Sequence, residues 1–303
     1  MRTPVLLSML AMAACSPAPA PSPPPNQAAA LMTWDDFAKL PRPKADLTLR
    51  YGDDPYQVVD LWLPARGERP APVILMVHGG CWTTGIADRS LMNPIAADLR
   101  ARGFAVWNID YRGVDRPGGG YPGTFADAAA AADLLRAQAA AHRLSLDHVV
   151  AVGHSAGGHL ALWLAGRARL PAASPLRSAA PLAIAGVVSL GGLPDLEQAR
   201  AEEQGCGAEV VDQLVGAEGS RVDRFIDTSV PRLAPLGVPQ ILVNGDSDRI
   251  IPVAFAKDYA AKMRAAGDTV GVEIVPRTGH VELITPTSAA WQRTLAAIER
   301  LRR

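Results

Sequence analysis

The chain has 303 residues, 49% of them hydrophobic and 20% charged, which is enough apolar material to bury the core of one large α/β domain or two small ones. Thirty Lys and Arg residues balance thirty Asp and Glu residues, which excludes nucleic acid as the main partner, because phosphate binding requires a surplus of positive charge. Three cysteines are too few for a disulfide scaffold, and without a CxxC pair or a Cys/His cluster the sequence predicts no metal site.

The N-terminus begins with one Arg and a short apolar run that ends at Cys15. The run is too short to span a bilayer as a helix and has the length of the apolar region of a secretory signal. The segment resembles a bacterial lipoprotein signal, in which small residues such as Ala13 and Ala14 precede a lipidated cysteine. Met12 departs from that pattern, and the alternative is an ordinary signal peptide cut near Ala13 or Ala18.

A proline-rich spacer follows. Residues 16–25 read SPAPAPSPPP, with six prolines in ten, and such a stretch cannot pack a core but forms an extended, semi-rigid tether. We therefore divide the chain into a signal peptide (1–15), a Pro-rich linker (16–31) and a folded domain (32–303). The resemblance implies export to the cell envelope, with a lipid anchor on Cys15 at the outer membrane or in the periplasm.

Past the linker, β-rich runs alternate with Ala-rich runs, which predicts a mostly parallel sheet covered by helices on both faces. Two early strand candidates, 47–51 and 57–63, are joined by a Gly-Asp-Asp-Pro turn that is typical of a hairpin. The later candidates are continuous apolar runs, as expected for strands buried on both faces. They are 73–77, 104–108, 149–152, 187–190, 241–243 and 272–275.

Runs rich in Ala, Leu and Arg between these strands predict helices. The helix candidates are 91–102, 125–144, 158–168, 254–266 and 288–302. Residues 192–236 break the alternation with acidic and turn-like stretches. We interpret them as an insertion after the sixth strand that serves as a lid.

The strongest functional signal is the sequence GHSAG at 153–157, which directly follows the strand candidate 149–152 and precedes a helix candidate. A GxSxG motif between a strand and a helix is typical of a nucleophile elbow, in which a sharp turn allows only small residues beside the serine. The helix N-terminus and the N–H of Ala156 favour negative charge nearby. We therefore predict Ser155 as the nucleophile, against the alternative of an incidental serine in a Gly-rich turn.

The sequence HGGCW at 78–82 also follows a strand candidate. Because Gly79 and Gly80 have no side chains, this loop can turn backbone N–H groups into a cleft. The N–H groups of Gly79, Gly80 or Cys81, together with that of Ala156, would bind the oxyanion of a tetrahedral intermediate. The alternative is a tight turn that uses glycine only for its backbone freedom.

Asp248 and His280 follow the last two strand candidates, so the chain order is Ser, Asp, His, the order of the hydrolase elbow enzymes. In that arrangement His280 accepts the serine proton, and an acid on its other nitrogen fixes the tautomer and stabilises the imidazolium. The histidines that flank Ser155, His154 and His159, are interpreted as neither bases nor metal ligands.

From about residue 51 onward the chain resembles the α/β-hydrolases, in particular the bacterial esterase and kynurenine-formamidase-like group marked by an HGGxW loop. Residues 78–82 match that loop, and the Asp-Tyr-Arg at 110–112 also fits the group. The family pattern G-x-x-D-x-x-[VI]-P places the acid on Asp248. Asp246 is its near rival, and Asp195 is a further candidate.

Two other positions leave alternatives open. Trp82 either lines an acyl or aryl pocket or packs in the interior. Cys81 and Cys206 are the cysteines that remain after signal removal, and we expect two separate thiols there. The alternative is a disulfide, which would tie the insertion to the oxyanion loop.

The residues therefore predict a serine hydrolase that forms an acyl-enzyme on Ser155 and requires no cofactor. We expect a carboxylesterase acting on small or medium acyl compounds, with an arylformamidase as the alternative, because the HGGxW loop resembles both groups. The expected partner is accordingly a small ester or formamide. A non-catalytic binding protein on a hydrolase scaffold is a second alternative, against which the presence of Ser155, Asp248 and His280 argues.

Overall fold

The computed structural model describes residues 30–202, 204–216 and 222–302. The chain divides into two compact units, Met1–Ala30 and Leu31–Arg303, and the second contains every helix and strand described below. The predicted signal peptide, Cys15 and nearly all of the predicted Pro-rich linker lie outside the described residues. In the part that is described, no helix is both long and apolar enough to cross a membrane.

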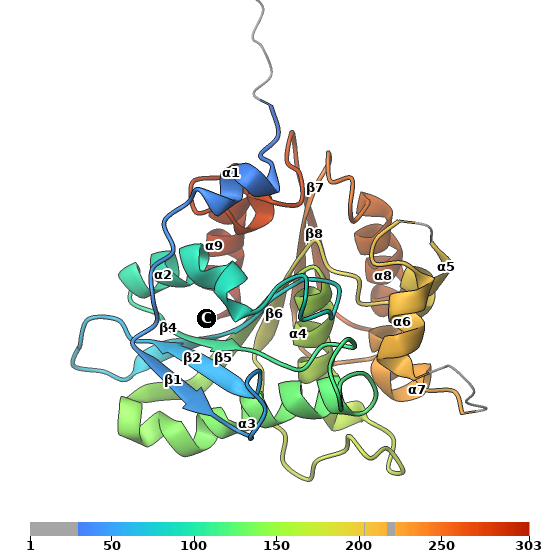
Figure 1. The fold of residues 1–303 in the computed structure, drawn as a ribbon, viewed down its shortest axis with the longest axis horizontal. Helices are drawn as coiled ribbons and strands as arrows, with labels where there is room; N and C mark the ends of the chain where they lie inside the picture. The colour runs from blue at the N-terminus through green and yellow to red at the C-terminus, as the bar shows by residue number, and fades with distance from the viewer. Residues whose placement is uncertain (1–29, 203, 217–221, 303) are drawn as a thin grey trace, which may run out of the picture. The chain divides into compact units, whose positions relative to one another are not determined.

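Within the described residues the second unit is built on one eight-stranded sheet with the strand order β1-β2-β4-β3-β5-β6-β7-β8 (Figure 1). The strands are β1 Leu47–Arg50, β2 Val58–Trp62, β3 Ala71–Val77, β4 Ala105–Ile109, β5 Leu144–His154, β6 Gly186–Leu190, β7 Gln240–Gly245 and β8 Val270–Val275. Strand β2 is antiparallel to both β1 and β4, and the pairs from β4 to β8 are parallel. Every strand candidate is thus confirmed.

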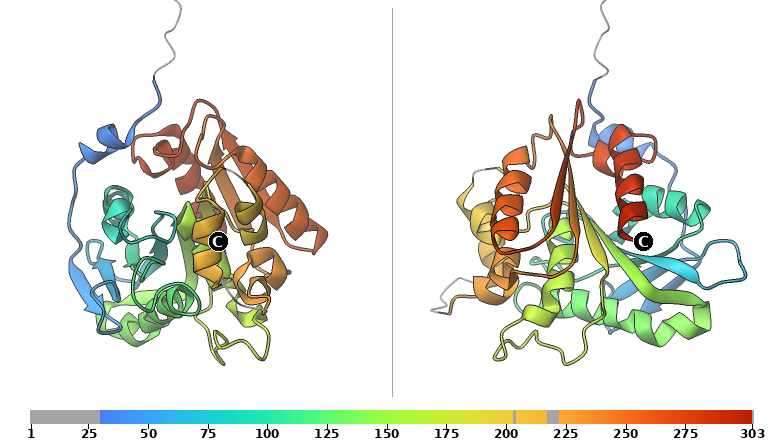
Figure 2. Two further views of the ribbon diagram at one scale, coloured as in Figure 1. Left: turned by 45° about the vertical axis from the view of Figure 1, so that its right-hand side comes forward. Right: turned by 180° about the vertical axis from the view of Figure 1, so that it is seen from behind.

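Helices cover both faces of this sheet. The longer ones are α2 Asn93–Ala101, α3 Gly123–His142, α4 Ala156–Gly166, α8 Val253–Ala265 and α9 Ala289–Leu301. Figures 1 and 2 show α2 and α9 on one side of the sheet, and α3, α4 and α8 on the other. Successive side chains of a strand point to opposite faces, so Leu75 of β3 joins the core under α3 and α4, whereas Ile74 and Met76 join the core under α2 and α9. This is why the central strands read as continuous apolar runs.

The insertion between β6 and β7 contains α5 Leu196–Ala201, α6 Ala208–Val215, α7 Phe225–Thr228 and the short 3₁₀ helix η3 Val230–Leu233. It packs beside α8 (Figure 1), where Asp195 pairs with Lys262 and Gln198 donates to Asp258. Apolar side chains of α6, among them Val211 and Leu214, are fully buried in the core on that face. The insertion is therefore an integral part of this face of the domain.

Candidate active site

Ser155 lies at the sharp turn between β5 and α4, with φ 54° and ψ −123°. A side chain at Gly157 would place its Cβ 2.2 Å from the carbonyl oxygen of Val77, and one at Gly153 would place it 2.0 Å from the carbonyl oxygen of Gly157. Only glycine fits at these two positions, which explains the motif physically. The N–H of Ser155 donates to the carbonyl of Leu190 on the neighbouring strand at 2.8 Å.

His280 and Asp248 form a buried pair. The Nδ1 atom of His280 lies 2.7 Å from Oδ2 of Asp248, and because a carboxylate only accepts hydrogen bonds, Nδ1 carries the proton and Nε2 is left available. The other carboxylate oxygen accepts the N–H groups of Ile250 and Ile251 at 2.8 and 2.9 Å. Asp248 is thus held at three points, and it fixes the imidazole of His280 in one tautomer.

The two rival acids lie in other surroundings. The carboxylate of Asp246 is exposed and accepts from the hydroxyl of Ser247 at 2.8 Å, a bond that lowers its pKa. Asp195 caps the N-terminus of α5 and pairs with Lys262. Neither carboxylate contacts His280.

The loop after β3 has an unusual backbone, because Gly80, Cys81 and Trp82 all have positive φ, at 103°, 50° and 51°. Gly79 lies close to the elbow, since a Cβ added there would be 3.0 Å from the Cβ of Ser155. Among the described residues, no acceptor pairs with the backbone N–H groups of Gly79, Gly80 or Cys81. These donors therefore lie beside Ser155 without partners, as an oxyanion hole requires.

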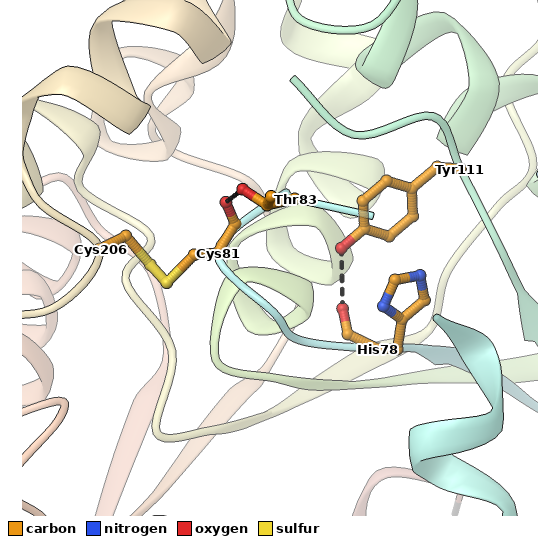
Figure 3. Close-up of a disulfide and its surroundings, with 5 residues drawn as sticks. All are labelled: His78, Cys81, Thr83, Tyr111 and Cys206. Carbon is orange, nitrogen blue, oxygen red and sulfur yellow. Dashed lines mark hydrogen bonds between the residues drawn. A yellow bond between two sulfur atoms is a disulfide. The ribbon is translucent and has the colours of Figure 1, made fainter. Parts of the chain in front are cut away.

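Polar and aromatic side chains support this loop on the side facing the interior. The ring nitrogens of His78 lie 2.7 Å from the carbonyl of Gly79 and 3.0 Å from Oδ1 of Asp110. Arg89 reaches the other oxygen of Asp110 at 2.9 Å. The ring of Tyr111 stacks on that of His78, and its hydroxyl donates to the His78 carbonyl at 3.0 Å (Figure 3). The sequence indicated residues 110–112 through the family pattern alone. It did not predict that Asp110 and Tyr111 support the loop after β3.

A disulfide joins Cys81 to Cys206, with the Cα atoms 5.3 Å apart (Figure 3). The expectation of two separate thiols is therefore wrong. The folded insertion brings Cys206 against the loop, although 125 residues separate the two cysteines in the chain, and such proximity is not visible in the sequence. The bond ties the loop of the unpartnered N–H groups to the insertion.

A cavity of about 360 Å³ opens beside Ser155 and His280. Its other lining residues are Trp34, Gly80, Cys81, Ile86, Ala87, Leu91, His154 and Ile250. Within the described ranges, no hydrogen bond joins Ser155 to His280, a contact that is often long until substrate binds.

The structure decides between the two alternatives for Trp82. Trp82 does not line it: the side chain is fully buried and packs edge-on against His159, with ring centroids 5.4 Å apart, so the packing alternative holds. None of the described residues of 192–236 is among the lining residues of this cavity, and the lid assigned to that insertion stays a prediction. The wall is formed instead by Trp34, from the N-terminal helix α1 (Trp34–Ala38), and by the 86–91 segment, whose apolar residues have no motif that could have revealed them.

His154 and His159 are both buried and uncharged. Burial lowers the pKa of His154 well below its ordinary value, and Nε2 donates to the carbonyl of His280 at 3.2 Å. Burial also lowers the pKa of His159 to about 4, and its Nε2 donates to the carbonyl of Thr228 at 2.8 Å. In the described part of the chain, no three His, Cys, Asp or Glu side chains form a group that could hold a metal ion.

Comparison with known proteins adds a family match. A sequence model of the family described as BD-FAE matches residues 59–263, more than half of the chain, a range that includes Ser155 and Asp248 but ends before His280. Esterase LipC of Mycobacterium tuberculosis is 30% identical over 246 residues, which are 76% of this chain and 58% of that protein. The chain spans little more than half the length of LipC and of other curated relatives.

Solved structures share the fold. Bacterial heroin esterase has a TM-score of 0.67 and 24% sequence identity, over 89% of this chain and 88% of that one. Thermogutta terrifontis esterase 2 phosphonylated by sarin has a TM-score of 0.69 and 20% identity, over 86% of this chain and 95% of that one. These likenesses confirm the expected fold, a mostly parallel sheet with helices on both faces.

Proposed function

Because the chain belongs to the BD-FAE family of α/β-hydrolases, we propose that it is a serine carboxylesterase acting on esters of small or medium acyl groups. One observation carries the proposal. Ser155 lies at a strained strand-to-helix turn and shares a cavity with His280, whose imidazole is hydrogen-bonded to buried Asp248. The similarity to Esterase LipC supports the same class of reaction.

In the proposed mechanism Ser155 Oγ attacks the ester carbonyl while Nε2 of His280 takes the hydroxyl proton. The carbonyl oxygen becomes an oxyanion, and the N–H groups of Gly79, Gly80 or Cys81 and of Ala156 stabilise it. The C–O bond then breaks, and His280 donates its proton to the leaving alcohol. Water, deprotonated by the same imidazole, attacks the acyl-enzyme, releases the acid and restores Ser155. Each step uses groups of this chain, the ester and water.

The proposal is tested with p-nitrophenyl butyrate, N-formylkynurenine and a fluorophosphonate probe, on the wild type and on Ser155→Ala. We expect the wild type to hydrolyse the ester and to bind the probe covalently, and the variant to lose both by a factor of about 10³ or more. Ester hydrolysis that survives in Ser155→Ala would refute the assignment of the nucleophile. A preference of the wild type for the formamide would change the reaction class to arylformamide hydrolysis.

We also propose that the protein is exported and held at the cell envelope by a lipid on Cys15, preceding a proline-rich tether. The support is the sequence of residues 1–25, and the serine after Cys15 favours the outer membrane by resemblance to other lipoproteins. Growth with a labelled fatty acid should label the wild type and not Cys15→Ala. Equal labelling of the two proteins, or none in either, would contradict the anchor.

A further inference from the structure

Trp34 is a large aromatic residue in the lining of the cavity. The residue is 43% exposed, and among the described residues it is one of the large hydrophobic residues at the surface. The ring stands nearly perpendicular to that of His280, with centroids 6.4 Å apart. An exposed tryptophan beside a reactive histidine presents apolar area that a bound molecule could cover.

The position of Trp34 is held by contacts on both sides of it. Met32 donates its N–H to one carboxylate oxygen of Glu282 at 2.5 Å, and the other oxygen accepts the N–H of Gly279 at 3.1 Å. Glu282 therefore connects the N-terminal segment to the loop that carries His280. Three residues after Trp34, the side chain of Phe37 is 1% exposed in the core under α2 and α9. These contacts of the neighbouring residues place Trp34 beside the loop that carries His280.

The chemistry of ester cleavage indicates which part of the substrate lies beside His280. His280 must donate its proton to the oxygen of the departing alcohol, so the alcohol lies against His280 and the acyl group lies away from it. The described lining of the cavity contains no Asp, Glu, Lys or Arg side chain. Its two histidines are His154, in the elbow, and His280, which is paired with Asp248. The region beside His280 is therefore suited to an uncharged, apolar group.

We propose that Trp34, together with Ile86 and Ile250, forms the subsite for the alcohol part of the ester, and that this subsite selects aryl or other bulky apolar alcohols. The inference depends on the proposed esterase function and goes beyond it by naming the part of the substrate that Trp34 contacts. An aromatic ring at this site would meet the indole face or edge, and such contacts change binding by about threefold to tenfold.

The test uses two esters with the same acyl group, 1-naphthyl butyrate and ethyl butyrate, and the variants Trp34→Ala, Trp34→Phe and Asp35→Ala. Rates are referred to active sites titrated with the fluorophosphonate probe, so that unfolded protein does not count. We expect Trp34→Ala to lower kcat/KM for the naphthyl ester about threefold to tenfold and to change that for the ethyl ester by less than about twofold. Trp34→Phe should recover most of the loss. Asp35→Ala is the matched control, at an exposed position of the same helix, and should behave as the wild type.

A second pair of esters separates alcohol from acyl recognition. With 1-naphthyl acetate and 1-naphthyl hexanoate, the loss of kcat/KM in Trp34→Ala should be the same for both acyl lengths. In the first pair, both butyrate esters form the same butyryl-enzyme, and its rate of hydrolysis should not change in Trp34→Ala. A loss that grows with acyl length, or an equal loss on naphthyl and ethyl esters, would overturn the assignment. An active Trp34→Ala with unchanged alcohol preference would overturn it too, leaving the esterase proposal intact. Absence of Ser155-dependent hydrolysis in the wild type would instead refute both the esterase function and the alcohol subsite.

Discussion

At the scale of single residues, two carboxylates after β7 show how surroundings assign a role. Asp248 is buried, accepts two backbone N–H groups and bonds to His280 at 2.7 Å. Asp246 is exposed, and its bonds among the described residues are to the neighbouring Ser247 side chain and to backbone. Sequence spacing could not separate these two residues, because both lie in the same loop, whereas the three-dimensional contacts distinguish them directly.

We therefore predict opposite outcomes for one substitution at the two positions. Asp248→Asn replaces an acceptor with an amide that no longer fixes the Nδ1–H tautomer of His280, and kcat should fall by about 10³ to 10⁴. Asp246→Asn is the matched control and should retain activity within about twofold, because this carboxylate is solvated. Steady-state rates on p-nitrophenyl butyrate measure both. A large loss in the Asp246 variant and a small one in Asp248→Asn would reverse the assignment.

His159 gives a prediction about pH and stability. Burial lowers its pKa from an ordinary 6.5 to about 4 in the folded protein. Between these values the unfolded chain binds a proton that the folded protein does not, so stability is lost as the pH falls from about 6.5 towards 4. This one group should remove on the order of 3 kcal/mol of the free energy of unfolding over that range.

Urea unfolding of the wild type and His159→Gln at pH 7.5 and 4.5 measures this effect. The glutamine does not titrate, and its amide can still donate to the Thr228 carbonyl that His159 bonds at 2.8 Å. We expect the variant to lose less stability than the wild type on acidification, by on the order of 2 kcal/mol. Equal losses in both proteins would show that His159 does not titrate as its burial implies.

At the scale of elements, the loop after β3 is held by contacts with distant parts of the chain. Buried His78 and Asp110 and half-buried Arg89 form a polar chain next to it, and Cys81 is bonded to Cys206 in the insertion. A loop with positive φ at three successive residues is strained and persists only when its surroundings hold it. The disulfide is therefore expected to matter both for stability and for the placement of the oxyanion donors.

Cys206→Ser tests this without touching the loop itself. Loss of a cross-link between residues 125 apart in sequence should lower the free energy of unfolding by about 3–5 kcal/mol. Because the donors of the loop lose a support, kcat/KM should fall about tenfold or more while Ser155 stays reactive to a fluorophosphonate. Dithiothreitol should reproduce both effects in the wild type and have no effect on Cys206→Ser. A fully active, equally stable variant would show that the loop needs no such tie.

The sequence predicted features that depend on local pattern. Continuous apolar runs located the parallel strands, the elbow located Ser155, and turn residues located the β1–β2 hairpin. It failed where a contact joins distant segments, as with the disulfide, with Trp34 in the cavity wall and with Glu282 between Met32 and Gly279. These contacts depend on how elements pack, and neither periodicity nor motif spacing records that packing.

At the scale of the whole molecule, the segment before β1 belongs structurally to the unit Leu31–Arg303. Phe37 fills the core under α2 and α9, Arg42 lies over its ring at 5.0 Å, and Met32 bonds to Glu282 beside the His280 loop. A segment that looks like the end of a linker in sequence is thus part of the core at one residue and part of the cavity wall at another.

Two truncations separate these roles. A chain beginning at residue 31 should keep the stability and esterase activity of the full protein, because it retains Trp34, Phe37 and the bond to Glu282. A chain beginning at residue 40 removes a buried Phe, which costs about 3–5 kcal/mol in a well-packed core, and it also removes the aromatic wall, so the preference for 1-naphthyl over ethyl butyrate should decrease. Trp34→Ala in the longer chain is the control: it should keep the stability, because Trp34 is 43% exposed, and lose the preference. If the chain beginning at residue 40 unfolds at the same urea concentration as the one beginning at 31, the N-terminal segment is not part of the folded core.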